Sequence, residues 1–333
     1  MPKLSRVSFF LFVFFYSYLW LRTIIFNYFY NNFGTEGFVL GLVMLLIVGV
    51  LMFFVPKKIN KLNWNNLLKK SGIKWLLTII NVLEIVFLTC YVSLYLKDVF
   101  INQSNLIILV IFLGIVIIYV SNMKSNEVID MSTLFYIFGI VLIVISFMIM
   151  PKIETEYLFI SGSGGRKGLL IMSGFLFLDS IKLSLVDKEK IKYNSSLPFI
   201  CGILLMLIEY GLLIMMAGDK TFIGLDYVGF LKLSFMPVTK YFGDFNFVYI
   251  YLMVVCLVFR SAFNLSVIKE NIKVNKTIIN LILFSLIVGS SLILLKNMPI
   301  NGLYKYVILI VYLMVFVFIW MIWECNYVRK SKR

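Results

Sequence analysis

The chain has 333 residues, of which 62% are hydrophobic and 14% are charged, and its mean hydropathy is +0.99. These values lie far outside the soluble globular range and exclude a water-soluble domain, so the composition predicts a protein whose solvent is mostly lipid. The formal net charge of +15 does not indicate nucleic-acid binding, because the basic residues are spread over segments where anionic lipid attracts them.

In chain order, ten long apolar stretches predict ten transmembrane helices within one integral membrane domain, residues 1–333. Most stretches have about 17 to 24 residues, enough for a helix to cross a hydrocarbon layer of roughly 30 Å. The runs do not alternate polar with apolar residues, as transmembrane strands would. The predicted spans are 7–30, 36–55, 74–96, 104–120, 131–150, 168–186, 197–217, 247–268, 277–295 and 303–323.

The first span follows Lys3 and Arg6, so a secretory signal peptide has to be considered. The stretch is too long and too aromatic for one, and it shows no small-residue cleavage site. We therefore expect a retained helix.

The distribution of Lys and Arg between loops predicts the orientation. If the N-terminus is cytoplasmic, 20 of the 31 Lys and Arg residues fall in inside segments and nine in outside segments. This bias places both termini in the cytoplasm.

The number of spans suggests two halves. A second block of five helices must begin on the opposite face from the first block, so two related halves would have the inverted topology of many secondary transporters. In such folds the first helix of each half is often interrupted. The sixth span is the least hydrophobic one and follows the glycine-rich segment 161–166, so we expect either a broken helix or a short helix with a flexible entry loop.

The longest outside loop, 218–246, carries aromatic and aliphatic residues among charged ones. This pattern suits short amphipathic helices on the outer mouth. The loop is either a lid over a substrate pathway or interfacial packing.

Ionisable residues inside the spans are the candidate ligand-binding groups, because each costs about 2.5 to 3.5 kcal/mol at the centre of a span unless it is paired or hydrated. Arg22 in the first span is expected to pair with Asp179 in the sixth, beside the hydroxyl groups of Thr23 and Ser180. This pair either touches the ligand or only holds the bundle together.

Glu84 lies in the middle of the third span and could carry a proton or bind a cation or ammonium group, or it could simply line a polar interior. Glu209 in the seventh span is grouped with Arg260 and Asn264 in the eighth. Arg260 is expected to be a positive-inside anchor near the cytoplasmic end.

The chemistry that the chain lacks is also informative. It contains no histidine, and Cys90, Cys201, Cys256 and Cys325 are not spaced as metal ligands or disulfide partners. No arrangement resembles a nucleophile with its base, and no glycine-rich loop has the spacing of a phosphate cradle. We therefore expect neither an enzyme nor a cofactor.

Two stretches resemble the spore germination permeases, the B subunits of nutrient germinant receptors in the amino acid, polyamine and organocation transporter superfamily. In 106–150, Tyr119, Lys124 and the run Glu127-Val128-Ile129 are similar to the family's Gly-Ile-Glu-Val segment before the fifth helix. In 233–264, Pro237 and Asp244 precede an aromatic-rich helix as in the family's outer loop.

The chain also departs from the family pattern at three places. Asp130 and Met131 stand where the family usually has an arginine, Trp20 to Arg22 stand in place of a glycine-bearing first helix, and Ser104 and Asn105 replace a Thr-Pro.

The resemblance implies a receptor subunit in a bacterial cell membrane, the spore inner membrane, that binds a small nutrient such as an amino acid and acts with other receptor subunits to trigger germination. A stand-alone amino-acid or cation transporter of the same fold is the alternative. An envelope-synthesis membrane enzyme is a third hypothesis, which the absence of long catalytic loops and of a histidine motif disfavours.

Overall fold

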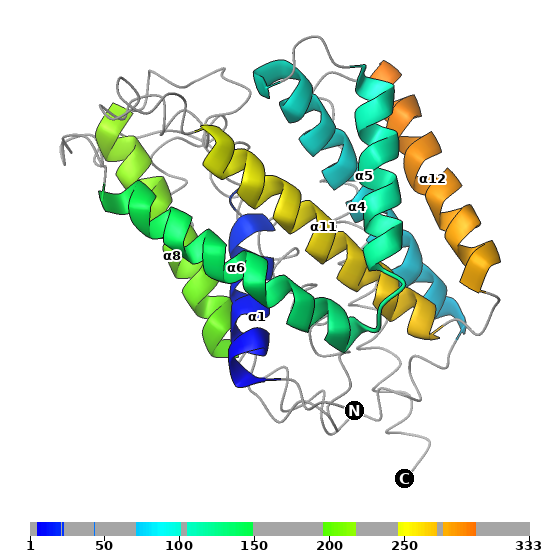
Figure 1. Ribbon diagram of the computed structural model, residues 1–333, viewed down its shortest axis with the longest axis horizontal. Coiled ribbons are helices and arrows are strands. Elements are labelled where there is room, and N and C mark those ends of the chain that lie inside the picture. The colour runs from blue at the N-terminus through cyan, green and yellow to red at the C-terminus, as the bar shows by residue number, and fades with distance from the viewer. Residues whose placement is uncertain are drawn as a thin grey trace.

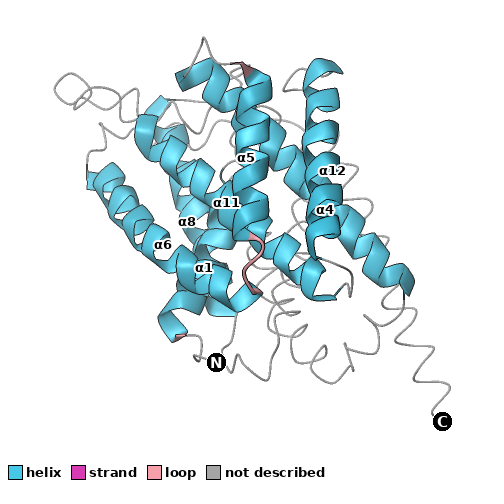
Figure 2. Cartoon of the chain, turned by 45° about the vertical axis from the view of Figure 1, so that its right-hand side comes forward, coloured by secondary structure: helices cyan, strands magenta, loops and turns pink. Residues whose placement is uncertain are grey.

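The computed structural model describes residues 5–20, 22, 43, 71–100, 105–148, 196–217, 246–271 and 276–297. Within these ranges every regular element is a helix and no strand occurs. Figures 1 and 2 show the helices packed as one bundle. The prediction of an all-α fold is therefore confirmed for the described part of the chain.

Seven α-helices coincide with seven of the predicted spans, the first, third, fourth, fifth, seventh, eighth and ninth. The predicted spans 168–186 and 303–323 lie outside the described residues, as do the span 36–55 apart from residue 43 and nearly all of the loop 218–246. A π-helical turn, η2 (Leu96–Phe100), directly continues α4. The α-helices are α1 (Arg6–Trp20), α4 (Ser71–Tyr95), α5 (Leu106–Val120), α6 (Ser125–Met148), α8 (Ser196–Ala217), α11 (Asn246–Asn271) and α12 (Lys276–Asn297).

Four of these helices contain segments that are long and apolar enough to cross a membrane: Trp75–Asp98, Ser125–Val144, Ile250–Lys269 and Thr277–Asn297. Three shorter apolar helical segments accompany them, Arg6–Tyr18, Leu106–Val120 and Leu197–Leu212. Exposed Ile, Leu and Phe side chains cover the outward faces of α5, α6 and α12, as expected where lipid is the neighbour. The protein is therefore membrane-embedded.

The α5–α6 hairpin shows why one helix boundary was predicted wrongly. The fifth span was expected to start at Met131, but α6 starts at Ser125. The Glu127 carboxylate accepts a hydrogen bond from the Lys124 backbone N–H (3.1 Å), which satisfies a donor that a helix start leaves unpaired and places negative charge at the positive end of the helix. The polar segment is thus the first turn of the helix, with Val128 and Ile129 buried.

α11 lies at the centre of the bundle. It packs against α1 and α6 on one side and against α4 and α5 on the other, and Figure 1 shows it running diagonally between these neighbours. α8 packs against α1, and α12 packs against both α4 and α5. The described helices therefore form two groups, α1 with α6 and α8, and α4 with α5 and α12, joined through α11.

Glycine allows close approach at two helix crossings of the described bundle. A Cβ atom on Gly202 of α8 would overlap the Ser17 hydroxyl of α1 and lie 2.6 Å from the Phe14 carbonyl oxygen. A Cβ atom on Gly114 of α5 would lie 2.8 Å from Val288 Cγ2 of α12. Small residues let helix backbones approach in this way inside membranes.

One end of the bundle joins two segments that were both predicted to be cytoplasmic. Lys269 Nζ near the end of α11 donates to Ser121 Oγ (2.6 Å) and Asn122 Oδ1 (3.1 Å) in the α5–α6 turn. Asn280 of α12 donates to the same Asn122 oxygen (2.9 Å). The end of α11 and the start of α12 therefore lie beside the α5–α6 turn, at the same end of the bundle.

Candidate ligand-binding site in the helix bundle

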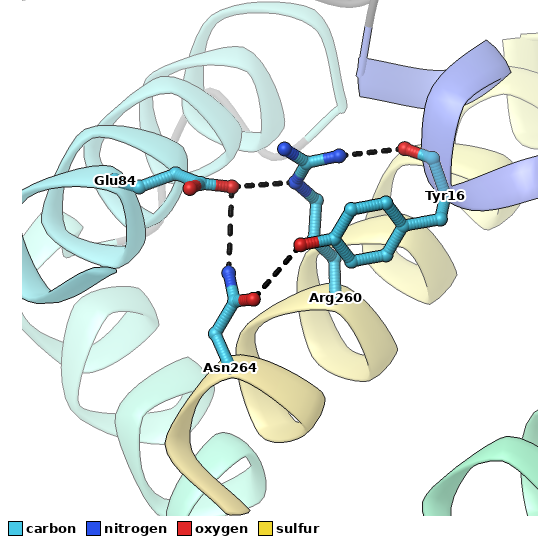
Figure 3. A network of polar contacts seen from close by, with 4 residues as sticks. All are labelled: Tyr16, Glu84, Arg260 and Asn264. Atoms are coloured by element: carbon cyan, nitrogen blue, oxygen red, sulfur yellow. Dashed lines mark hydrogen bonds and ion pairs between the residues drawn. The ribbon is translucent and has the colours of Figure 1, made fainter. Parts of the chain in front are cut away.

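A buried polar network connects α1, α4 and α11 (Figure 3). Arg260 Nε of α11 donates to Glu84 Oε1 of α4 at 2.5 Å, and Arg260 Nη1 donates to the backbone carbonyl of Tyr16 in α1 at 2.6 Å. The Arg260 guanidinium carbon also lies 4.0 Å from the centroid of the Tyr16 ring. One arginine thus holds three helices together.

Asn264, one helical turn beyond Arg260, closes this network. Its Nδ2 lies 3.4 Å from Glu84 Oε1, and its Oδ1 accepts a hydrogen bond from the Tyr16 hydroxyl at 2.8 Å. None of the four side chains is more than 1% exposed. Charge-assisted hydrogen bonds in such an environment are strong, because little solvent screens them.

The burial of Arg260 corrects the expectation that it is an interfacial anchor. Arg260 is the fifteenth of the 26 residues of α11 and Glu84 is the fourteenth of the 25 residues of α4. The ion pair therefore lies midway along two membrane-crossing helices. Unpaired charge is most costly at this depth, and an intramembrane ionisable residue is by default a functional-site candidate.

Aromatic side chains enclose the network on the side of α1 and α6. Phe12 packs against Phe263 with ring centroids 4.9 Å apart, and Phe15 stacks on Tyr136 at 4.7 Å. Tyr136 also contacts Phe259 of α11. On this side the charged groups thus border a low-dielectric wall that strengthens their attraction.

A second buried ion pair joins α8 to the residues that follow α1. Arg22 Nε lies 2.9 Å from Glu209 Oε2, and both side chains are almost fully buried. The Arg22 guanidinium carbon is 5.7 Å from the centroid of the Tyr18 ring.

The structure shows two ion pairs that were not predicted, and the Arg22–Asp179 pair stays a prediction. Glu84 and Glu209 are buried as expected, but Glu209 pairs with Arg22, and Arg260 pairs with Glu84. The predicted partner of Arg22 was Asp179. Asp179, Ser180 and Thr23 lie outside the described residues.

Tyr16 is the residue that sequence reasoning missed. It is one of many aromatic residues in the first span, and nothing in the sequence separates it from its neighbours. Asn264 was named from the sequence together with Arg260, which it follows by four residues, so that both lie on the same face of a helix.

Two further buried polar atoms lie in the chain beside the network. Asn81 Oδ1, one turn before Glu84, and Ser261 Oγ, next to Arg260, have no hydrogen-bond partner among the described residues. Buried polar groups in native proteins are usually satisfied by protein, water or ligand. These two atoms can therefore form hydrogen bonds in addition to those within the network.

The chemistry available to the site is electrostatic binding. A carboxylate, a guanidinium, an amide, hydroxyl groups and an aromatic face lie within the bundle. Within the described ranges, no group of three or more Cys, Asp or Glu side chains is placed to hold a metal ion. The arrangement suits recognition of a small charged solute.

Comparisons with known proteins do not assign the chain to a family. No protein-family model matches the sequence, and no match to a characterised protein is found.

Proposed function

We propose that the protein is the membrane subunit of a nutrient receptor of the spore-germination type, which binds a small nutrient such as an amino acid within its helix bundle. The observation that carries this proposal is the Glu84–Arg260 pair, which lies midway along α4 and α11 and is 2.5 Å long. A buried, hydrogen-bonded pair of opposite charges in a membrane span is a natural site for solute binding.

Charge balance favours a ligand that carries both signs. A ligand with only a carboxylate would leave Glu84 without its counter-charge, and a ligand with only an ammonium group would do the same to Arg260. Uncompensated buried charge is strongly unfavourable. An amino acid offers a carboxylate to Arg260 and an ammonium group to Glu84, so both buried charges stay paired.

The packing of the helices supports the proposal of five plus five spans in inverted repeats. Under that scheme α4 corresponds to α11 and α5 corresponds to α12. The symmetry then relates the contact of α4 with α12 to the contact of α11 with α5, and both contacts are extensive. The relation is approximate, since α4 also packs closely on α5 while α11 and α12 are not among the closely packed pairs.

In this scheme Glu84 and Arg260 occupy equivalent places in the third helix of each half. Transporter-like folds place their ligands near the midplane, where the two halves meet. We further propose that Arg22, Thr23, Glu209, Asp179 and Ser180 form the other wall of the site, at the level of the first and sixth spans.

The same geometry supports a stand-alone amino-acid or cation transporter as the second function. Glu84 is a titratable carboxylate in the middle of a span, and such residues carry protons in transporters. Concentrative uptake by the purified protein alone in liposomes would establish transport without partner subunits.

The experiment that tests the proposed function is a binding measurement on the purified chain. The melting temperature of the protein in detergent is measured in the presence of each of a panel of amino acids, because a ligand that binds only the folded state raises it. Glu84→Gln is expected to abolish the shift. The proposal is contradicted if no amino acid stabilises the wild-type protein or if the variant responds equally.

In a spore-forming host, Arg22→Ala and Asp179→Ala are expected to abolish the germination response while the variants still insert into the membrane. A normal response of both variants would remove Arg22 and Asp179 from the site.

A further inference from the structure

The Arg260 side chain fills a cage that is suited to an organic cation. We infer that Arg260 is an intramolecular occupant of this cage, and that the described conformation is the self-inhibited form of the site. The inference rests on the proposed function and adds to it the cationic group that the site takes from a ligand, a guanidinium or a primary ammonium.

Three groups of the cage contact the guanidinium. Glu84 Oε1 accepts from Nε at 2.5 Å, the Tyr16 carbonyl oxygen accepts from Nη1 at 2.6 Å, and the Tyr16 ring centroid lies 4.0 Å from Cζ. A carboxylate, a carbonyl oxygen and an aromatic face are the groups that proteins use to bind alkylammonium and guanidinium ions.

The walls of the cage are held by contacts that do not depend on Arg260. The Tyr16 hydroxyl donates to Asn264 at 2.8 Å, and the Asn264 amide nitrogen lies 3.4 Å from the Glu84 carboxylate (Figure 3). α1 is also fixed to α8 at the Gly202 crossing. Removing the Arg260 side chain should therefore leave the cage formed and vacant.

Self-occupation has a consequence for affinity. A ligand cation has to displace Arg260 before it reaches Glu84, so the apparent affinity is reduced by the fraction of protein in which the cage is open. A ligand that also carries an anionic group lowers this barrier, because it takes over the charge of the displaced guanidinium.

Chemical rescue tests the inference without knowledge of the nutrient. Arg260→Ala is purified in detergent and its melting temperature is measured with millimolar ethylguanidinium chloride, with N-ethylurea, which is its neutral analogue, and with NaCl at the same ionic strength. We expect a saturable rise of several degrees with ethylguanidinium alone. Wild-type protein should not respond, because its cage is filled.

Two controls separate the cage from a simple cavity. The double variant Glu84→Ala/Arg260→Ala lacks the carboxylate and should lose the response. Phe259→Ala opens a cavity at the neighbouring position on α11, against Phe135 and Tyr136, and should not respond to the cation. Equal stabilisation by N-ethylurea, or an undiminished response in the double variant, would overturn the inference.

If Arg260→Ala is too unstable to purify alone, the additives are present from solubilisation onward and the yield of monodisperse protein is measured. The yield must then depend on ethylguanidinium and on Glu84, and a yield that is independent of the cation counts against the cage. The outcome is distinct from that of the proposed function. If ethylguanidinium stabilises Arg260→Ala but no nutrient binds the wild-type protein, the cage is supported and the receptor function is contradicted. If a nutrient binds the wild-type protein but ethylguanidinium does not stabilise Arg260→Ala, the receptor function is supported and the cage is contradicted.

Discussion

Glu84 and Arg260 are 176 residues apart in the sequence, yet their side chains meet at 2.5 Å in the middle of the bundle. The pair joins α4 to α11, the helix that contacts both groups of helices. The stability of the bundle should therefore depend on these two residues together.

Replacing one partner of this pair should be more damaging than replacing both. Glu84→Leu or Arg260→Met alone removes the buried counter-charge of the other residue and should lower the free energy of unfolding by about 3 to 5 kcal/mol. The double variant should recover much of this loss, because apolar side chains of similar volume often replace buried ion pairs without cost. Thermal or denaturant unfolding of all four proteins in detergent gives the coupling. Additive losses would show that the two side chains do not interact.

The Tyr16 hydroxyl should contribute to the network separately from the ring. Tyr16→Phe keeps the ring and the backbone carbonyl but leaves Asn264 Oδ1 without its donor, which should cost about 1 to 3 kcal/mol. Tyr251→Phe is the matched control, because its hydroxyl donates to the Phe135 carbonyl at an exposed position. The control should cost clearly less in the same unfolding measurement. Equal losses would contradict a special role of Tyr16.

The crossing of α1 and α8 should not tolerate even one additional carbon atom. Gly202→Ala places a Cβ against the Ser17 hydroxyl and the Phe14 carbonyl, and the forced separation of the helices should cost about 1 to 3 kcal/mol. Gly289→Ala on α12 is the control, since a Cβ there meets no atom within 4 Å. The control should unfold at the wild-type temperature or slightly above it. A stable Gly202→Ala variant would show that this crossing is loose.

The predicted orientation can be measured by cysteine labelling in membrane vesicles. Lys124 and Asp98 are both exposed. Lys124 directly precedes the N-terminal end of α6, whereas Asp98 follows the C-terminal end of α4. In a background without other cysteines, Lys124→Cys should react with a membrane-impermeant maleimide only from the cytoplasmic side, and Asp98→Cys only from the outer side. The reverse pattern would invert the topology.

Sequence reasoning predicted the seven described helices well but did not predict the Glu84–Arg260 and Arg22–Glu209 pairs, and both results have a physical cause. The length of an apolar run reports the thickness of the bilayer, so the predicted bounds of α8, α11 and α12 lie within three residues of the observed ones. The start of α6 was missed because its first turn is polar and looks like a loop until the Glu127 cap is seen.

The partners of the buried charges could not be read from the spans. Helices in lipid lack the polar outer face that reveals which side packs inward. The sequence therefore could not predict which neighbouring helix the side chains of Arg22, Glu84, Glu209 and Arg260 face. Arg260 was placed too near the cytoplasm because the predicted span ended at residue 268, whereas α11 runs to Asn271. The cost of burying charge nevertheless singled out the two acids and two arginines that the structure pairs.

The separation of Glu84 from Arg260 also bears on how the protein is made. α4 emerges from the ribosome long before α11 is synthesised, so for that interval the Glu84 carboxylate has no Arg260 to neutralise it. A chain that is truncated before α11 should therefore be recognised as incomplete and degraded by membrane proteases.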